Sequence, residues 1–305
     1  MESNTPSKKV SFSILMANNN NANYIEEAIE SVISQSYANW ELIIVDDCSH
    51  DNSIEIIKRY LNDKRIKLIN HKKNQGYGAA LKTAAENASN NVLGILDADD
   101  KLHYTALEVM AKAYQENPNC GFIYSTMWDC DAELQNCQVN KWIGPTIPEK
   151  SNIYNTSISH FKTFTRTAYL KTPGFDPKQK KGVDKDIIFK LEEVTDLKYV
   201  DQPLYYYRQH TGGISQSQKH FKSDYYHYYA KLKAYKRRYN KEIPNLSKEE
   251  INAEYYRIVV YRLRKFLVRL YKKLNLSILT KMILNLLPTS IIQLKSKVQI
   301  LKIIF

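Results

Sequence analysis

The feature that most constrains the fold is a regular alternation, between residues 10 and 96, of short apolar runs with stretches of helical periodicity. The apolar runs occupy residues 10–17, 42–45, 66–69 and 92–96. In the first stretch between them, apolar side chains recur every three or four positions and predict an amphipathic helix, as follows: Ile25, Ala28, Ile29, Val32 and Ile33. Strand–helix units of this length build a parallel, doubly wound sheet through right-handed crossovers. The sequence therefore predicts an α/β fold.

Polar clusters follow three of these apolar runs, at residues 18–20, 46–49 and 97–100. In doubly wound sheets, ligands bind beyond the carboxyl ends of the strands, and all three clusters fall there. This common placement predicts that they contribute to one site.

The last of these clusters places three carboxylates within four positions, at Asp97, Asp99 and Asp100. Each carboxylate raises the pKa of its neighbours, so a divalent cation or strong hydrogen bonding is the expected compensation. Hard oxygen ligands suit Mg²⁺ or Mn²⁺ that holds a phosphate. The alternative for this cluster alone is a solvated acidic turn that caps the next helix.

The second half of the chain is less regular. Short strand-like pieces with Gly and Pro fill residues 120–148, and residues 184–193 have helical periodicity. Asp184 and Asp186 lie in the first turn of that helix, where the helix dipole favours acids, so a purely structural role is a serious alternative for both. Two further strands are predicted at residues 197–200 and 204–207.

The net charge of +12 calls for an anionic partner: nucleic acid, a phosphate-bearing ligand or an anionic membrane surface. No acidic residue follows Glu254, and residues 256–274 carry an apolar stripe with basic residues beside it. Such a helix lies on an anionic membrane, binds a partner helix or packs on its own domain. The apolar residues 282–288 and 291–305 favour the membrane, but neither run is long enough between charges to span a bilayer. The four cysteines lack Cys-x-x-Cys spacing, which argues against zinc and makes a reducing, cytosolic setting the default.

An N-terminal segment and five shorter motifs after it occur in the order typical of one family. The segment VSFSILMANNNNANYIEEAIESVISQSYANWELIIVDDCSHDNS, at residues 10–53, is followed by NQG, LDADD, GFD, DKD and YRQH, at residues 74–76, 96–100, 174–176, 184–186 and 207–210. In this combination the chain resembles family 2 glycosyltransferases with the GT-A fold. The likeness covers residues 10–215. It implies a GT-A domain there, a Rossmann-like, doubly wound mixed sheet, with a disordered N-terminus at residues 1–9 and a basic, amphipathic helical extension at residues 216–305.

The resemblance also implies roles for individual residues. The residues that it implies for binding of the donor nucleotide are Ala17, Asn19, Asp46, Asp47, Gly76, Asp97, Ala98 and Asp99. The residues that it implies as ligands of the metal, Mn²⁺ or Mg²⁺, are Asp99, Asp100 and His210. Asp184 matches the second residue of the family's Glu-Asp pair, the expected general base. The chain departs from the pattern where Val183 replaces the Glu of that pair. It also departs where the loop Ala17-Asn18-Asn19-Asn20 replaces the usual Pro-Thr-Tyr-Asn, so that an aromatic ring that could stack on the base is missing.

The function so implied is inverting transfer of a sugar, hexosyl or N-acetylhexosaminyl, from a nucleoside diphosphate, expected to be UDP, to an acceptor hydroxyl. The acceptor is expected to be a saccharide or a lipid-linked glycan in bacterial surface polysaccharide synthesis, and the enzyme to be cytoplasmic, peripheral on the inner face of the membrane. The alternative is a catalytically degenerate protein that binds a nucleotide sugar or a partner. A nicotinamide-dependent oxidoreductase ranks behind because no Gly-x-Gly-x-x-Gly follows the first strand, and nucleic acid is not expected as a partner because no recognition motif occurs.

Overall fold

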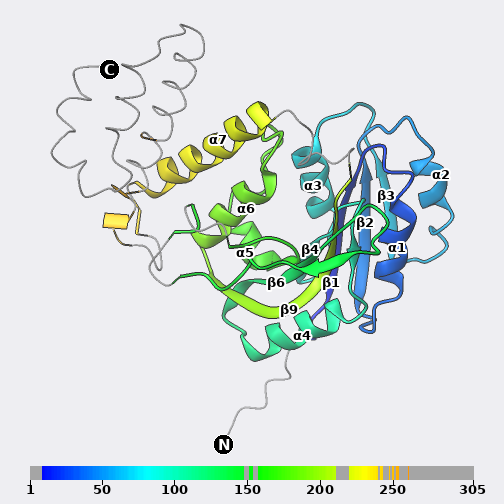
Figure 1. Cartoon of the computed structure of the whole chain (residues 1–305), viewed down its shortest axis with the longest axis horizontal. Helices are drawn as coiled ribbons and strands as arrows, with labels where there is room; N and C mark the ends of the chain where they lie inside the picture. The colour runs from blue at the N-terminus through cyan, green and yellow to red at the C-terminus, as the bar shows by residue number, and fades with distance from the viewer. Residues whose placement is uncertain are drawn as a thin grey trace, which may run out of the picture.

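The computed structural model describes residues 9–147, 151–153, 157–210 and 220–239, together with 241–242, 247, 249–250, 252–253 and 260. The described strands form one mixed sheet (Figure 1), in the order β3-β2-β1-β4-β8-β6-β9-β5, and β7 pairs with β6. Their bounds are β1 Phe12–Asn18, β2 Trp40–Asp46, β3 Ile66–Asn70, β4 Val92–Ile95, β5 Lys101–Leu102, β6 Cys120–Cys130, β7 Cys137–Val139, β8 Lys162–Thr165 and β9 Asp196–Arg208.

The first half of the sheet is parallel, as the alternation of patterns predicts. β1 pairs with β2 and with β4, and β2 pairs with β3. Every residue of β1 and β2 is buried, because helices cover both faces. Figure 1 shows α1 (Ile25–Ile33) and α2 (Ser53–Lys58) on one face and α3 (Tyr77–Glu86) on the other. The predicted α/β fold is confirmed.

The second half of the sheet is mixed. β8 is antiparallel to both β4 and β6, and β5 is antiparallel to β9. The structure confirms β structure after residue 120 in β6 and β7. The helices of this half are α4 (Ala106–Glu116), α5 (Arg166–Leu170) and α6 (Val183–Glu192). Of these, the sequence analysis predicted α6.

β9 corrects the prediction of two separate strands at residues 197–200 and 204–207. The structure has one strand of 13 residues that runs parallel to β6. Pro203 lacks a backbone N–H, and such a residue usually interrupts a strand. Here the register of β9 against β6 shifts beside it, from Ser125↔Val200 to Thr126↔Pro203. A β-bulge of this kind absorbs the proline without ending the strand.

A disulfide joins Cys130 to Cys137, at the ends of β6 and β7 that face each other across a loop. The sequence analysis expected a reducing environment for all the cysteines and proposed no pairing. Cys48 and Cys120 are free. The bond closes the loop at residues 131–136, which lies beside the candidate site described below.

Helix α7 (His220–Arg238) packs against α6. Arg238 is completely buried, and its guanidinium bonds Glu192, Glu193 and the hydroxyl of Ser151. Gly182, the residue before α6, has φ +63° and lies against His227 of α7. The first helix of the C-terminal extension therefore contacts the element that carries Asp184, and the boundary placed at residue 215 stays a prediction.

Among the described residues, no helix combines the length and the apolar character that a bilayer crossing requires. The N-terminus at residues 1–8 and almost all of the basic stripe at residues 256–274, with residues 282–305, lie outside the described residues.

Candidate active site

The carboxyl ends of β1 and β2 meet as neighbours, because Asn18 is in register with Asp46. The Asn18 side-chain amide donates to Asp46 Oδ1 at 2.7 Å, and Ser49 donates to the same carboxylate through both its backbone N–H and its hydroxyl. Asp46 is fully buried, so its role is to shape this edge of the sheet. Asn19 is exposed, and Ala17 lies beneath it with little exposed surface.

Asp47 holds the loop that leads into α3. Its carboxylate accepts hydrogen bonds from the backbone N–H groups of Gln75 and Gly76, at 2.8 and 2.6 Å, and lies 2.7 Å from His71 Nδ1. Gly76 has φ +95°, a conformation that favours glycine. Because His71 and these N–H groups already occupy the carboxylate, Asp47 fixes the shape of the loop that leads into α3.

His71 was missed by the sequence analysis. Its Nε2 also lies 3.0 Å from the hydroxyl of Thr83 on α3. The signal that would have found it is its place directly after β3, at the same edge of the sheet as Asp47.

The three carboxylates of the acidic turn after β4 differ in their burial and in their contacts. Asp100 is buried and accepts from the Tyr205 hydroxyl at 2.7 Å and from the Arg208 N–H at 2.8 Å. Asp97 and Asp99 are more exposed, at 23% and 25% of their side chains. Asp97 accepts a short hydrogen bond from the Tyr77 hydroxyl, whereas Ala98 between them is buried and offers its backbone alone.

His210 lies next to Asp99, with its Nε2 2.9 Å from Asp99 Oδ2. The distance along the sequence is 111 residues, so this approach is produced by the fold. The pairing of β5 with β9 brings the end of β9 to the acidic turn. The structure thus brings together Asp99 and His210, which the sequence analysis assigned to a metal.

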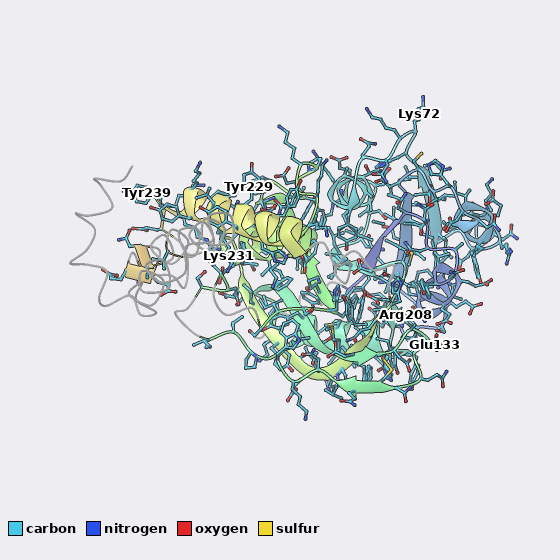
Figure 2. All side chains as sticks on the ribbon, turned by 45° about the horizontal axis from the view of Figure 1, so that its top comes forward. Lys72, Glu133, Arg208, Tyr229, Lys231 and Tyr239 are labelled. Carbon is cyan, nitrogen blue, oxygen red and sulfur yellow. A yellow bond between two sulfur atoms is a disulfide. The ribbon has the colours of Figure 1, made fainter. Side chains whose placement is uncertain are left out.

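Arg208 fastens this end of β9 to its surroundings. The side chain is buried, and its guanidinium donates to the backbone carbonyls of Asp99, at 2.7 Å, and of Ala132. It also pairs with Glu27 at 2.8 Å and stacks on the ring of Tyr24. Figure 2 shows Arg208 beside Glu133 in the β6–β7 loop.

The electrostatics of the acidic turn fit a divalent cation. Burial, together with the charge of Asp99, raises the pKa of Asp97 to about 6, and the same causes raise the pKa of Asp100 well above its usual range. A cation that neutralises the carboxylates would remove this cost. Oxygen and imidazole atoms of Asp97, Asp100 and His160 also lie within 4.8 Å of one another. The residues present therefore fit Mn²⁺ or Mg²⁺.

His160 was not predicted, and it lies between the acidic turn and α6. Its ring stacks on Tyr205 with 4.5 Å between ring centroids, and its Nε2 is 3.8 Å from Asp97 Oδ2. The ammonium of Lys162 lies 3.2 Å from its Nδ1. Burial and this ammonium lower the pKa of His160 well below its usual range, so the imidazole is neutral.

Asp184 lies in the first turn of α6, and its side chain is 36% exposed. Its carboxylate is 3.9 Å from the ammonium of Lys162. Burial, the largest influence, raises its pKa, but the charges of Lys162 and Lys185 and a hydrogen bond from the Lys185 backbone N–H outweigh it and bring the pKa to about 2. Asp184 is therefore ionised at neutral pH.

Asp186, in the same turn, has the structural role that the sequence left open. It is buried and forms ion pairs with Lys190 at 2.6 Å and with Lys233 of α7 at 3.0 Å. The two aspartates of this turn therefore differ. Asp186 is enclosed by cations, whereas Asp184 borders the cluster that contains His160 and Asp97.

Comparisons with known proteins agree with this arrangement. A family described as glycosyl transferase family 2 matches residues 13–173. The chain is 30% identical, over 72% of its own length and 81% of the relative's, to a putative colanic acid biosynthesis glycosyl transferase, WcaA, of Escherichia coli strain K12. It is 29% identical to chondroitin synthase of Escherichia coli over 73% of its length. The chain spans about a third of that synthase, and about a fifth of the chondroitin and hyaluronan synthases of Pasteurella multocida.

Solved structures share the fold at low identity. The first 349 residues of Staphylococcus aureus TarS, in complex with UDP-GlcNAc, superpose with a TM-score of 0.66, 17% identity, and coverage of 82% of this chain and 72% of that one. The mannosyltransferase PcManGT of Pyrobaculum calidifontis, in complex with GDP-Man and Mn²⁺, superposes with a TM-score of 0.60, at 16% identity, over 82% of this chain and 70% of that one.

Proposed function

This chain belongs to glycosyl transferase family 2, and from that premise we propose that it transfers a sugar, with inversion, from a nucleoside diphosphate to a hydroxyl of a glycan acceptor. The observation that carries the proposal is the cluster in which an ionised carboxylate, Asp184, lies across Lys162 and His160 from the acidic turn. One side of this cluster suits a diphosphate with its cation, and the other suits the removal of a proton.

For the donor we propose a UDP-sugar. TarS, which shares the fold, has been crystallised with UDP and with UDP-GlcNAc, whereas PcManGT was crystallised with GDP-Man. In this chain the nucleobase would lie against Ala17 and Asn19, in the pocket shaped by Asp46, Asp47 and the Gly76 loop. A thermal-shift screen of nucleoside diphosphates and their sugars tests this choice, because a ligand that binds the folded state raises the melting temperature. A larger shift with GDP-sugars than with UDP-sugars would refute it.

The proposed reaction divides the work among the chain's own residues. Asp97, Asp99 and Asp100, with His210, would hold the cation, which would supply positive charge to the departing diphosphate. Asp184, as carboxylate, accepts the proton of the acceptor hydroxyl while that oxygen attacks the anomeric carbon and the bond from that carbon to the diphosphate breaks. The electron pair of the broken bond leaves with the diphosphate. Attack opposite the leaving group inverts the anomeric centre.

Replacement of the base tests the mechanism. Asp184→Asn keeps the shape of the side chain and should lower turnover by about 10²–10⁴-fold, the usual worth of general-base catalysis, while donor affinity stays the same. The matched control is Asp201→Asn on β9, an exposed position whose carboxylate accepts from Tyr199. Transfer by Asp184→Asn at the rate of the control would remove Asp184 from the mechanism.

The metal role is tested separately by calorimetry. Asp99→Asn should weaken donor binding in the presence of Mn²⁺ and leave the weaker binding without Mn²⁺ unchanged, because the lost group acts through the cation. His210→Gln should behave in the same way, since its imidazole lies against the same carboxylate. Equal donor affinity of wild type and both variants with Mn²⁺ would show that the cation is held elsewhere or is not used.

For the pathway we propose synthesis of a bacterial surface polysaccharide at the inner face of the cell membrane. This rests on the names of relatives that act in colanic acid, teichuronic acid and chondroitin synthesis, and on the basic, apolar sequence of residues 256–305. Flotation with anionic vesicles should recover the whole chain but not a chain ended after Tyr239, which keeps Arg238 and its partners in α6. Equal flotation of the two would refute membrane contact through this segment. An absence of both donor hydrolysis and transfer would instead favour a degenerate binding protein.

A further inference from the structure

An ammonium group lies in the interior directly beside the proposed base. The Lys162 side chain is 1% exposed, and its Nζ is 3.9 Å from Asp184 Oδ2. Strand pairing fixes its backbone, because β8 is hydrogen-bonded between β4 on one side and β6 on the other. A lysine is costly to bury without a partner, and the described partners of this ammonium are Asp184 and the ring nitrogens of His160.

His160 extends this contact toward the donor side. The neutral imidazole accepts from the Lys162 ammonium, and its Nε2 lies 3.8 Å from Asp97 Oδ2. Stacking on Tyr205 and Tyr207 fixes the plane of the ring. Lys162 therefore lies between the carboxylate that would take the acceptor's proton and the carboxylates that would meet the donor, on a rigid strand.

We propose that Lys162 is the positioning residue for Asp184: its ammonium, held in place by β8, fixes the orientation of the carboxylate toward the acceptor. The inference rests on the proposed role of Asp184. It also accounts for Val183, which stands directly before the base where the family pattern has a Glu. In this chain the group that adjusts the base is a cation from a neighbouring strand.

The charged groups that face Asp184 come from four elements. Lys162 belongs to β8, His160 precedes that strand, and Lys185 follows Asp184 on α6. Asp97 and Asp99, after β4, and the Tyr77 hydroxyl of α3 lie on the donor side. Of the charges that lower the pKa of Asp184, that of Lys162 has the largest effect, whereas burial raises the pKa. Removing the ammonium takes away the larger of the two lysine charges and leaves Lys185 alone to oppose burial, so the pKa of Asp184 should rise.

The test compares Lys162→Met, which keeps the length of the side chain without its charge, with Lys162→Arg, which keeps the charge. With donor and Mn²⁺ saturating, Lys162→Met should lower kcat/KM for the acceptor by about 10–10²-fold, because the base is no longer oriented. The acid limb of its pH profile should move up by about one pH unit or more. Lys162→Arg should restore most of the rate and the position of the acid limb. Donor affinity should change by less than about threefold, because the lost ammonium acts on the base and not on the donor.

The matched control is Lys190→Met. Lys190 is also buried and also pairs with an aspartate of α6, Asp186, so its loss should reduce stability without moving the acid limb. Should Lys162→Met not fold, the pair Asp184→Asn with Lys162→Met removes both charges together. That double variant should transfer no more slowly than Asp184→Asn alone.

Two results would overturn the inference: a wild-type pH profile in Lys162→Met, or a further loss of rate when Lys162→Met is added to Asp184→Asn. The failure of the proposed function is distinguishable. If Asp184→Asn transfers at the wild-type rate, the base is misassigned; if Asp184→Asn is inactive while Lys162→Met matches wild type, only the role of Lys162 fails.

Discussion

Replacing Arg208 by methionine should remove the contacts that join the end of β9 to the acidic turn, to the β6–β7 loop and to Glu27. Methionine keeps the apolar length of the side chain and removes the guanidinium. The backbone N–H that donates to Asp100 remains in any variant, so the acidic turn keeps that contact. The variant therefore isolates the guanidinium, which bonds the Asp99 and Ala132 carbonyls and Glu27.

The expected cost follows from the exposure of each partner. The two hydrogen bonds to backbone carbonyls are partly buried and have a charged donor, and each contributes about 1.5–3 kcal/mol. Glu27 is 51% exposed, so that ion pair contributes at most about 1 kcal/mol. Such terms are not additive, and the loss of a buried, paired charge is about 3–5 kcal/mol as a whole. The free energy of unfolding should fall by that amount, and the melting temperature by on the order of 10 °C.

Urea denaturation followed by circular dichroism measures the loss of stability, and calorimetry with Mn²⁺ measures donor affinity at a temperature where the variant is folded. Donor affinity should fall by about tenfold or more, because His210 is two residues beyond the lost anchor and Asp99 accepts from it. The control is Arg65→Met. Arg65 also stacks on an aromatic ring, that of Trp40, and also pairs with a carboxylate, but it is more exposed and lies at the other end of the strands. A stability and a donor affinity within error of the control would refute the role given to Arg208.

Three further outcomes are expected. Asp97→Asn should stabilise the metal-free protein by about 1–3 kcal/mol at pH 7. The pKa of Asp97 in the folded state, about 6, lies above the unfolded value, so the wild type gains stability as the pH falls from 7 through 6 to about 4. Urea titrations of the Asn variant should lack this gain. Arg238→Met should lower the free energy of unfolding by about 3–5 kcal/mol, since it leaves glutamates of α6 buried beside α7 without their partner; urea titrations with a change below 1 kcal/mol would contradict it. Cys130→Ser should cost about 2–3 kcal/mol under oxidising conditions, the loop-closure value for a separation of 7 residues, and nothing in excess dithiothreitol, as thermal melts under both conditions would show.

The sequence predicted those parts of the molecule that depend on local pattern. The four strands up to residue 96 are continuous apolar runs, because both faces of that half of the sheet are covered, and each was placed within a few residues. The family and the GT-A fold are confirmed by the match at residues 13–173 and by the likeness to TarS. Asp99 and His210 were expected in one site on the strength of the motif order, and the structure places them in contact.

The unpredicted residues owe their positions to pairing between distant segments. Lys162 reads as a solvated lysine in a polar stretch, and only the insertion of β8 between β4 and β6 buries it. No motif around His160 indicates that it is a site residue, because its partners Asp97 and Tyr205 lie far away in the sequence. His71 becomes a partner of Asp47 only because β2 and β3 end side by side. In β9, Pro203 suggested that the strand ends, but a bulge against β6 accommodates it. No local pattern in the sequence reveals that β6 is the partner of β9.

The length of β9 has a consequence for how the donor side moves. A strand rises about 3.3 Å per residue, so its 13 residues extend across most of the molecule, from the end of α6 to Arg208 beside the acidic turn. The amides of Tyr205 to Arg208 belong to the same ladder as those near Asp196, and they exchange with solvent only when that ladder opens. Hydrogen exchange in this stretch should therefore be slow before any ligand is added. A donor that binds at the acidic turn, as proposed, would meet an end of β9 that is already ordered, and little ordering entropy would be lost there on binding.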